Sequence, residues 1–372
     1  MGIIVGLPLT GGKETDFQME VQKIQTDEIE MRAPFLPSEW YEQSGVQLTW
    51  PHAGTDWKRM LTQVQECFIQ IALPIAQREK LLVVTPHTQE TRKQLVAGGI
   101  NMDNVRLVEC PTNDTWARDH APLSVVDSQA TYLLDFTFNG WGLKYAADLD
   151  NRISRHVFDS GLLHAKYENR KNFVLEGGSI DSDGKGTLLT TEDCLLAPNR
   201  NDTMNQVEIE EYLRSAFHVQ RVLWLKHGYL TGDDTDGHVD TLARFCPNDT
   251  IAYVECKDED DEQYKELKLM EEELKTFRTL TDKPYRLLPL PMPSPIYMDG
   301  FRLPATYANF LVINGAVLYP TYNQPANDNK AREVLQTAFQ NYDLVGIDCR
   351  PLIKQHGSLH CVTMQYPKNV LI

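Results

Sequence analysis

A recurring order of predicted elements is the feature that most constrains how this chain can fold. Four times, two short strands flank a turn, a helical stretch follows, and one further strand comes after the helix. The four hairpins are expected at residues 122–136, 178–190, 241–254 and 310–319. The last one turns at Asn314-Gly315, the strongest short hairpin signal that a sequence offers. The chain is therefore predicted to be an α/β protein built from repeated hairpin–helix–strand units.

The helices and third strands of these units follow from apolar spacing. Helices are expected at 148–163, 204–217, 262–280 and 327–339, and strands at 165–167, 219–225, 285–288 and 344–347. A fifth unit begins at Cys361 but ends after one strand, 362–366. The strand predicted at 46–50 can supply the missing hairpin partner. This pairing would close a ring of five units with no open strand edge.

The N-terminal part is predicted to hold further helices and buried strands. Helices are expected at 56–73 and 88–97, and buried strands at 81–85 and 105–109. Residues 1–33 carry little pattern and are predicted to be a loose leader. Residues 34–372 are then expected to form a single domain, in place of the two or three ordinary domains that 372 residues allow.

Charge and cysteine usage limit the class of partner. The net charge of −16 argues against nucleic acid or an anionic membrane and is compatible with a small cationic substrate. Seven cysteines are scattered without a CxxC pair, so neither a disulfide framework nor a zinc ribbon is indicated. With no export signal and no apolar run of membrane-spanning length, a reduced cytoplasm is expected. The sequence leaves a homo-oligomer open.

Residue types that carry chemistry stand just before, or at the start of, successive predicted hairpins. They are Asp119 with Trp116 nearby, Glu176, His238 with Asp240, Asn309 and Cys361. In a closed ring these positions converge near one axis. One pocket would then hold a thiol, an imidazole, several carboxylates and an amide.

Such a pocket suits a guanidinium ion, which is planar, carries only hydrogen-bond donors and stays charged at any workable pH. Carboxylates are its best acceptors, and Asp119, Glu176 and Asp240 can supply them. Its resonance-stabilised carbon requires a strong, soft nucleophile such as a thiolate. The positive charge of the substrate would help lower the pKa of the cysteine. One histidine can then protonate the leaving ammonia and later activate water.

Each of these residues also has an ordinary structural explanation. Asp119 can pair with Arg118, Glu176 can accept from the amides of a turn, and His238 can be a core histidine. Trp116 can serve packing alone, and Asn309 can cap a turn. Their common placement at the starts of the units is what these explanations leave unexplained.

The histidines are further sorted by strand alternation. The His238-x-Asp240 spacing predicts both side chains on one face of a strand. His360 would point to the opposite face from Cys361 on a strand and is expected to be a poor general base. His52 and His356 have no evident role.

A metal site is the weaker interpretation of the acidic stretch from Asp233 to Asp240. The stretch partly resembles a calcium loop, but the place of the bidentate acid is taken by Phe245. A catalytic zinc would need further histidines at ligand spacing. No metal and no cofactor are therefore predicted.

At these residues the chain resembles the agmatine deiminase family, which is grouped with bacterial peptidylarginine deiminases in the guanidine-modifying superfamily. The matching stretches are 36–40, 48–51, 113–119, 175–178, 236–240, 314–320 and 360–361. The resemblance extends from about residue 34 to the end of the chain. It implies a fivefold pseudo-symmetric α/β propeller and cofactor-free hydrolysis of agmatine to N-carbamoylputrescine and ammonia through an amidino-cysteine intermediate.

The resemblance also implies the roles of single residues. By matching position, Cys361 is the nucleophile and His238 the acid and base. Asp119 and Asp240 hold the guanidinium, Glu176 assists, and Trp116 lines the pocket. Asn309 is expected to contribute to substrate binding.

The sequence departs from the agmatine deiminase pattern beside the nucleophile. Gln355-His356-Gly357-Ser358-Leu359 replaces a glycine-rich run, and His120-Ala121-Pro122 follows Asp119 where the family has a residue-Gly-Pro. Peptidylarginine deiminases share a Gly-Ser pair at this place, but they are usually exported. The lack of an export signal favours the small amine.

Three other functions stay open at this point. A peptidylarginine or free-arginine deiminase would form citrulline. A metal-dependent amidohydrolase would use Asp236, His238 and Asp240. An inactive guanidinium-binding module would bind agmatine without turnover.

Overall fold

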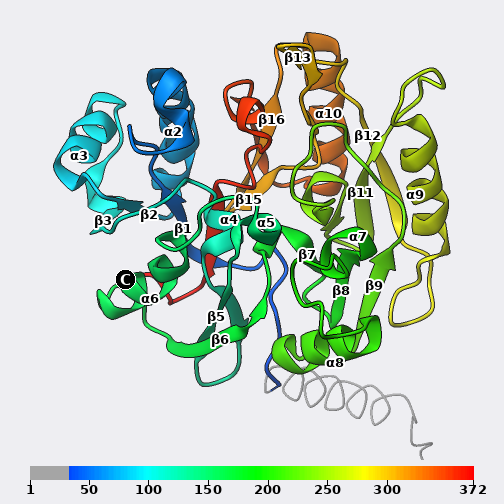
Figure 1. Ribbon diagram of the computed structural model, residues 1–372, viewed down its shortest axis with the longest axis horizontal. Helices are drawn as coiled ribbons and strands as arrows, with labels where there is room; N and C mark the ends of the chain where they lie inside the picture. The colour runs from blue at the N-terminus through cyan, green and yellow to red at the C-terminus, as the bar shows by residue number, and fades with distance from the viewer. Residues whose placement is uncertain (1–32) are drawn as a thin grey trace, which may run out of the picture.

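The computed structural model describes residues 33–372 and has a mixed α/β fold of several small sheets and helices (Figure 1). The predicted leader at 1–33 lies, except for its last residue, outside the described residues. None of the helices within 33–372 combines the length and the apolar character that crossing a membrane requires.

Four sheets follow the predicted unit, a hairpin of two antiparallel strands whose second strand pairs in parallel with a third strand after the helix. The first unit consists of β4 (Leu123–Val126), β5 (Thr131–Thr137), α6 (Ile153–Asp159) and β6 (Lys166–Val174). The second consists of β7 (Ile180–Ser182), β8 (Thr187–Thr191), α8 (Gln206–Phe217) and β9 (Arg221–Leu225). The third consists of β10 (Ala243–Cys246), β11 (Thr250–Glu255), α9 (Tyr264–Thr276) and β12 (Arg286–Pro291). The fourth consists of β15 (Leu311–Ile313), β16 (Ala316–Thr321), α10 (Pro325–Ala338) and β17 (Asp343–Asp348).

The fifth sheet joins the two ends of the described chain, as predicted. Strand β1 (Gln43–Thr49) pairs antiparallel with β18 (Thr363–Pro367), with Val46 opposite Gln365. After α2 (Leu61–Ala76), β2 (Lys80–Thr85) pairs in parallel with β1. After α3 (Thr88–Ala97), β3 (Val105–Glu109) adds a fourth strand. The sheets are separate, and a two-stranded hairpin, β13 (Tyr297–Met298) with β14 (Phe301–Arg302), was not predicted.

Two predicted elements differ from the structure for local reasons. The helix expected at 148–163 shortens to α6, because the residues before it bind a neighbouring loop: the carboxylate of Asp150 accepts the backbone amides of Asn113 and Asp114. The strand expected at 165–167 extends to Val174 as the edge strand of its sheet; all of its residues except Phe173 are at least partly exposed, so it lacks the apolar pattern by which a strand is recognised.

Buried apolar side chains from the strands and helices hold the units together. In β2, both faces are buried: Leu81 and Val83 belong to the largest apolar cluster, and Leu82 and Val84 to another. This explains the continuous apolar run of this strand. Short helical turns connect the units and carry the polar residues of interest: α4 (Ala117–His120), η4 (Gly177–Ser179) and η5 (Val239–Thr241). Helix α4 lies near the middle of the view in Figure 1.

Candidate active site

A cavity of about 380 Å³ opens beside the thiol of Cys361. Three predicted site residues line it, namely Cys361, Asp119 and Trp116. Asn309, Glu176, His238 and Asp240 lie beneath the cavity wall and are at most 1% exposed. Gly357 packs flat on Trp116, because a Cβ atom at this position would lie 2.1 Å from the indole ring.

Asp119 connects the cavity to the residues beneath it. Its Oδ1 accepts the backbone amide of Gly178 at 3.0 Å and lies 3.7 Å from Nδ1 of His238. Its Oδ2 accepts the indole Nε1–H of Trp141 at 2.9 Å. Burial, with Asp240 nearby, raises the pKa of Asp119 to about 6, although His238 acts in the opposite direction. Arg118 does not pair with it and contacts Gln365 and Glu39 instead, so the ordinary ion-pair explanation is wrong.

His238 precedes a single helical turn, so the predicted strand placement of His238 and Asp240 is wrong. The backbone before it turns through Asp236 and Gly237, both with left-handed φ values of 68° and 82°. The backbone amide of His238 donates to Oγ1 of Thr235 at 3.1 Å, and its two ring nitrogens have no hydrogen-bond partner in the part of the chain that the structure describes. Burial lowers the pKa of His238, but the charge of Asp119 and further nearby groups outweigh it and hold this pKa well above its ordinary value.

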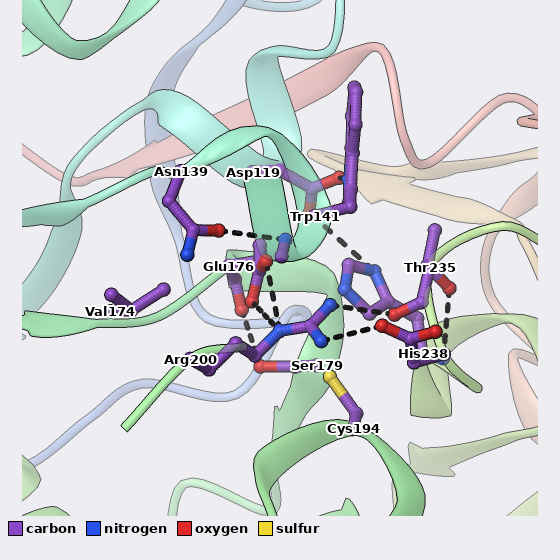
Figure 2. Close-up of polar contacts among 12 residues, drawn as sticks. Asp119, Asn139, Trp141, Val174, Glu176, Ser179, Cys194, Arg200, Thr235 and His238 are labelled. Atoms are coloured by element: carbon purple, nitrogen blue, oxygen red, sulfur yellow. Dashed lines mark hydrogen bonds and ion pairs between the residues drawn. The ribbon is translucent and has the colours of Figure 1, made fainter. Parts of the chain in front are cut away.

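Glu176 lies at the start of η4, and its carboxylate binds an arginine that sequence reasoning missed. Both of its oxygens accept from Nε of Arg200, at 3.1 and 3.0 Å, in a pair whose side chains are fully buried (Figure 2). The carboxylate of Glu176 therefore binds Arg200 and does not accept the amides of the turn, as its ordinary structural explanation had it. No local pattern marks Arg200, which lies between α7 (Glu192–Leu195) and α8.

Asp240 is held by His360 and keeps one oxygen free. Nδ1 of His360 lies 2.7 Å from Oδ2 of Asp240, and its Nε2 contacts Glu39. Oδ1 of Asp240 is buried without a hydrogen-bond partner in the described residues. Burial raises the pKa of Asp240, but the hydrogen bond and charge of His360 more than offset this effect, and the pKa is lowered. His360 thus holds Asp240 and lowers its pKa, which its expected orientation away from Cys361 did not suggest.

Cys361 lies in a turn before β18 and not on the strand itself. The side-chain oxygen of Asn309 lies 3.4 Å from its sulfur and also accepts the backbone amide of His360 at 2.8 Å. Asn309 therefore holds the turn that carries the thiol. Burial and the charges of Asp240 and Asp119 raise the pKa of Cys361 well above its ordinary value.

The outer part of the cavity is acidic, which sequence reasoning did not anticipate. Among residues 33–372, its lining includes four further carboxylates and neither lysine nor arginine: Asp56, Asp114, Asp150 and Asp234. Burial raises the pKa of both Asp114 and Asp150 to about 7. The hydroxyl of Tyr145, which also lines the cavity, donates to Asp234 at 2.9 Å.

Trp141 is a second missed residue and stands on a strained turn, α5 (Gly140–Leu143). Gly140, Trp141, Gly142 and Leu143 all have positive φ. For the two non-glycine residues this backbone conformation costs free energy. The turn is held by Asn199, whose side-chain amide donates to the carbonyl of Gly142 at 3.0 Å. Four successive positive φ values, which sequence patterns do not predict, thus bring the indole of Trp141 to Asp119.

One group of side chains that could hold a metal ion includes His238. Within the described residues, Glu176, Cys194 and His238 bring one possible ligand atom each to within 4.8 Å of one another. Arg200 occupies both oxygens of Glu176, so a cation already balances this carboxylate. Of the residues in the metal interpretation, Asp236 binds Arg200 and Lys144, and Asp240 binds His360.

Known proteins share this arrangement of elements. A family model described as Porphyromonas-type peptidyl-arginine deiminase matches residues 35–367. A Porphyromonas gingivalis protein, provisionally named an arginine deiminase, is 49% identical with a TM-score of 0.86, over 91% of this chain and 100% of that one. An agmatine deiminase of C. jejuni with substrate bound is 38% identical with a TM-score of 0.84, over 91% and 97%.

A curated sequence relative agrees with the structural comparisons. The agmatine deiminase of Ectopseudomonas mendocina is 32% identical over 356 residues, which span 89% of this chain and 95% of that protein. The resemblance stated from the motifs is thereby confirmed. The chain belongs to the Porphyromonas-type peptidyl-arginine deiminase family.

Proposed function

We propose that this protein is a cysteine-dependent hydrolase that converts agmatine to N-carbamoylputrescine and ammonia. The observation that carries the proposal is the cavity itself, which the thiol of Cys361 and the carboxylate of Asp119 line together with four further carboxylates. Only a ligand that brings positive charge to both ends would be favoured there. Agmatine has a guanidinium at one end and an ammonium at the other.

The guanidinium is held by carboxylates around the sulfur. Asp119 offers an oxygen at the cavity, and Asp240 keeps its Oδ1 free, so two acceptors can meet the planar donors from different sides. Trp116 and Trp141 supply flat walls, with ring centroids 6.3 Å apart. Glu176 assists from beneath, through its position beside His238.

The charge of the substrate activates the nucleophile. In the ligand-free arrangement, burial and two nearby carboxylates keep the thiol of Cys361 protonated. A bound guanidinium neutralises Asp119 and Asp240, which lowers the pKa of the thiol at the moment when the target carbon is in place. The nucleophile is therefore active mainly when substrate is present.

The reaction then proceeds in two halves with His238 as the proton carrier. When the guanidinium binds, the thiol proton of Cys361 is released to solvent. The thiolate then forms a bond to the guanidinium carbon, and the imidazolium of His238 gives its proton to one nitrogen, which leaves as ammonia when the carbon–nitrogen bond breaks. The amidino-cysteine remains. Neutral His238 next takes a proton from water, and the new hydroxide bonds to the same carbon. The carbon–sulfur bond breaks to release the thiolate, and the hydroxyl proton is lost to solvent as N-carbamoylputrescine forms.

Arginine and peptidyl-arginine are the rival substrates, supported by the family description and by the Gly357-Ser358 pair. The acidic outer cavity argues against free arginine, because the substrate's own α-carboxylate would lie among Asp114, Asp150 and Asp234. A peptide with arginine inside its chain lacks that charge, whereas a peptide with C-terminal arginine keeps it, and either must enter a cavity of about 380 Å³. Agmatine is therefore the favoured substrate.

The test compares agmatine, arginine and a peptide with C-terminal arginine, with ammonia, N-carbamoylputrescine and citrulline measured for each. We expect turnover of agmatine, loss of at least a thousandfold in Cys361→Ala, and little change in the control Cys256→Ala, whose thiol lies away from the cavity. Full activity in Cys361→Ala would show that Cys361 is not the nucleophile. Citrulline as the main product would show that arginine or peptidyl-arginine, and not agmatine, is the substrate. Loss of activity in the presence of a chelator would favour the metal-dependent amidohydrolase. Binding of agmatine without any product would favour the inactive guanidinium-binding module.

The fold and setting extend this proposal. We infer that the five units close into a fivefold pseudo-symmetric propeller formed by one catalytic domain, 34–372; the pairing of β1 with β18 and the cavity-lining residues from several units support it. We also propose a cytoplasmic location without a cofactor. The seven free cysteines of the described chain support a reducing compartment.

A further inference from the structure

Arg200 binds three different parts of the candidate active site at once. Its Nε contacts the carboxylate of Glu176, its Nη1 lies 2.7 Å from Oδ2 of Asp236, and its Nη2 donates to the carbonyl of Thr235 at 2.8 Å (Figure 2). The side chain is fully buried. It does not line the cavity, so it has no direct access to a substrate there.

Two of these contacts fix the turn from which His238 projects. Asp236 has a left-handed φ of 68°, which a non-glycine residue adopts only where its surroundings hold it. Arg200 holds this residue through its carboxylate and the preceding residue, Thr235, through its carbonyl. Because the hydroxyl of Thr235 accepts the backbone amide of His238, the guanidinium of Arg200 acts on the backbone that places the imidazole.

The third contact controls the charge beside the imidazole. Side chains facing His238 come from several elements and comprise Asp119, Asp240, Glu176 and Cys194. Arg200 is the cation that balances Glu176, and Nδ1 of His238 faces Asp119 at 3.7 Å. Without Arg200, Glu176 would either act on His238 with its full charge or take up a proton.

We propose that Arg200 is a positioning residue for the deimination: it orients His238 through the 235–237 turn and keeps Glu176 from pairing with the imidazole. This inference rests on the proposed function. A wild-type protein that turns over no guanidino compound would refute that function first, and the Arg200 variants are therefore interpreted only against an active wild type.

The experiment uses the full chain with Arg200→Met, Arg200→Lys and the control Arg221→Lys. Arg221 is a partly buried arginine that binds Thr187 and Tyr285 near the opposite end of β8, away from the site. For each variant, kcat and KM for agmatine are measured from pH 5 to pH 10, and the unfolding midpoint is recorded. Lysine keeps the charge but lacks the fork that reaches three partners.

We expect Arg200→Met to lower kcat about a hundredfold or more, with KM changed by less than about threefold, because the cavity lining is untouched. The alkaline limb of kcat/KM should move up by about 0.5 to 1 pH unit, because a carboxylate without its cation stabilises the imidazolium. Arg200→Lys should keep the alkaline limb near its wild-type place and recover about tenfold of kcat. Arg221→Lys should match the wild type.

Two results would overturn the inference. An unchanged kcat in folded Arg200→Met would show that the contacts of Arg200 have no bearing on the reaction. A lower kcat with an alkaline limb that stays at its wild-type pH would mean that Arg200 only supports folding, because a smaller folded fraction lowers the rate without moving a pKa. If Arg200→Met does not fold, Arg200→Lys decides: a kcat within twofold of the wild type would overturn the inference.

Discussion

The indole of Trp141 donates a hydrogen bond from Nε1 to Oδ2 of Asp119 at 2.9 Å, so an aromatic wall of the cavity also sets the state of its carboxylate. This hydrogen bond favours the charged form and lowers the pKa of Asp119, which burial raises to about 6. We therefore expect the strained turn that carries Trp141 to contribute to catalysis and not only to packing.

Replacing Trp141 with phenylalanine keeps a flat wall and removes the donor. We expect kcat/KM for agmatine to fall about ten- to a hundredfold, since a hydrogen bond to a charged group contributes roughly 1.5–3 kcal/mol. The acidic limb of kcat/KM should move to higher pH, because Asp119 must be ionised to bind a guanidinium and its pKa rises without the indole. A pH–rate profile checks this. An acidic limb that stays at its wild-type pH would mean that the indole does not influence the pKa of the carboxylate.

The pKa of the thiol offers a second measurement that needs no turnover. Asp240 raises the pKa of Cys361 through its negative charge, so Asp240→Asn is expected to lower that pKa. Iodoacetamide should then label Cys361 several-fold faster at pH 8, while turnover of agmatine is lost. Mass spectrometry of the labelled cysteine is the measurement. The control Asp258→Asn removes an equal charge at the surface and should leave the labelling rate unchanged; slower labelling in Asp240→Asn would contradict the expected sign.

Sequence patterns predicted most of the fold because hairpins and amphipathic helices are local. The Asn314-Gly315 turn lies between β15 and β16, and the strand near the start of the domain pairs with β18 as expected. The His238-x-Asp240 spacing misled because alternation on a strand and a single helical turn both place two residues close together. Here the left-handed backbone at Asp236 and Gly237 leads into the turn and not into a strand.

The residues missed in the site are those defined by contacts through space. Arg200 reaches Glu176 across 24 positions and Asp236 across 36, and Trp141 reaches Asp119 across 22. No spacing rule links side chains that lie so far apart along the chain. The predicted residues were found because each stands at the start of a unit, which is a regularity along the chain.

The acidic outer cavity predicts a dependence of stability on pH. In the folded protein, burial raises the pKa of Asp114 from 3.8 to about 7, so the folded state binds the proton more tightly than the unfolded state does. Stability therefore falls as pH rises from about 4 to about 7 and stays reduced above that. We expect Asp114→Asn to raise the free energy of unfolding by about 1 kcal/mol at pH 8 and by almost nothing at pH 4.

Urea unfolding of Asp114→Asn at the two pH values measures this difference. The exposed Asp103 provides the control, because Asp103→Asn removes a carboxylate at the surface and should give the same small change at both. An equal gain for Asp114→Asn at pH 4 and pH 8 would mean that packing, and not charge, is responsible.

Gly178 marks the point where the three central side chains leave no room for another atom. A Cβ at this position would lie 2.6 Å from Nδ1 of His238, 3.0 Å from Oδ1 of Asp119 and 3.1 Å from Oδ2 of Asp240. Gly178→Ala must therefore displace the imidazole or the carboxylates, and we expect kcat/KM to fall about a hundredfold or more, as small misplacements of catalytic groups do. In the control Gly346→Ala, on β17, the new methyl group meets Thr321 and Tyr319 at 3.0 and 3.2 Å, outside the cavity, and activity should persist. Steady-state kinetics on both variants decides the matter, because near-normal turnover in Gly178→Ala would show that His238 need not occupy the position beside Asp119 for the reaction.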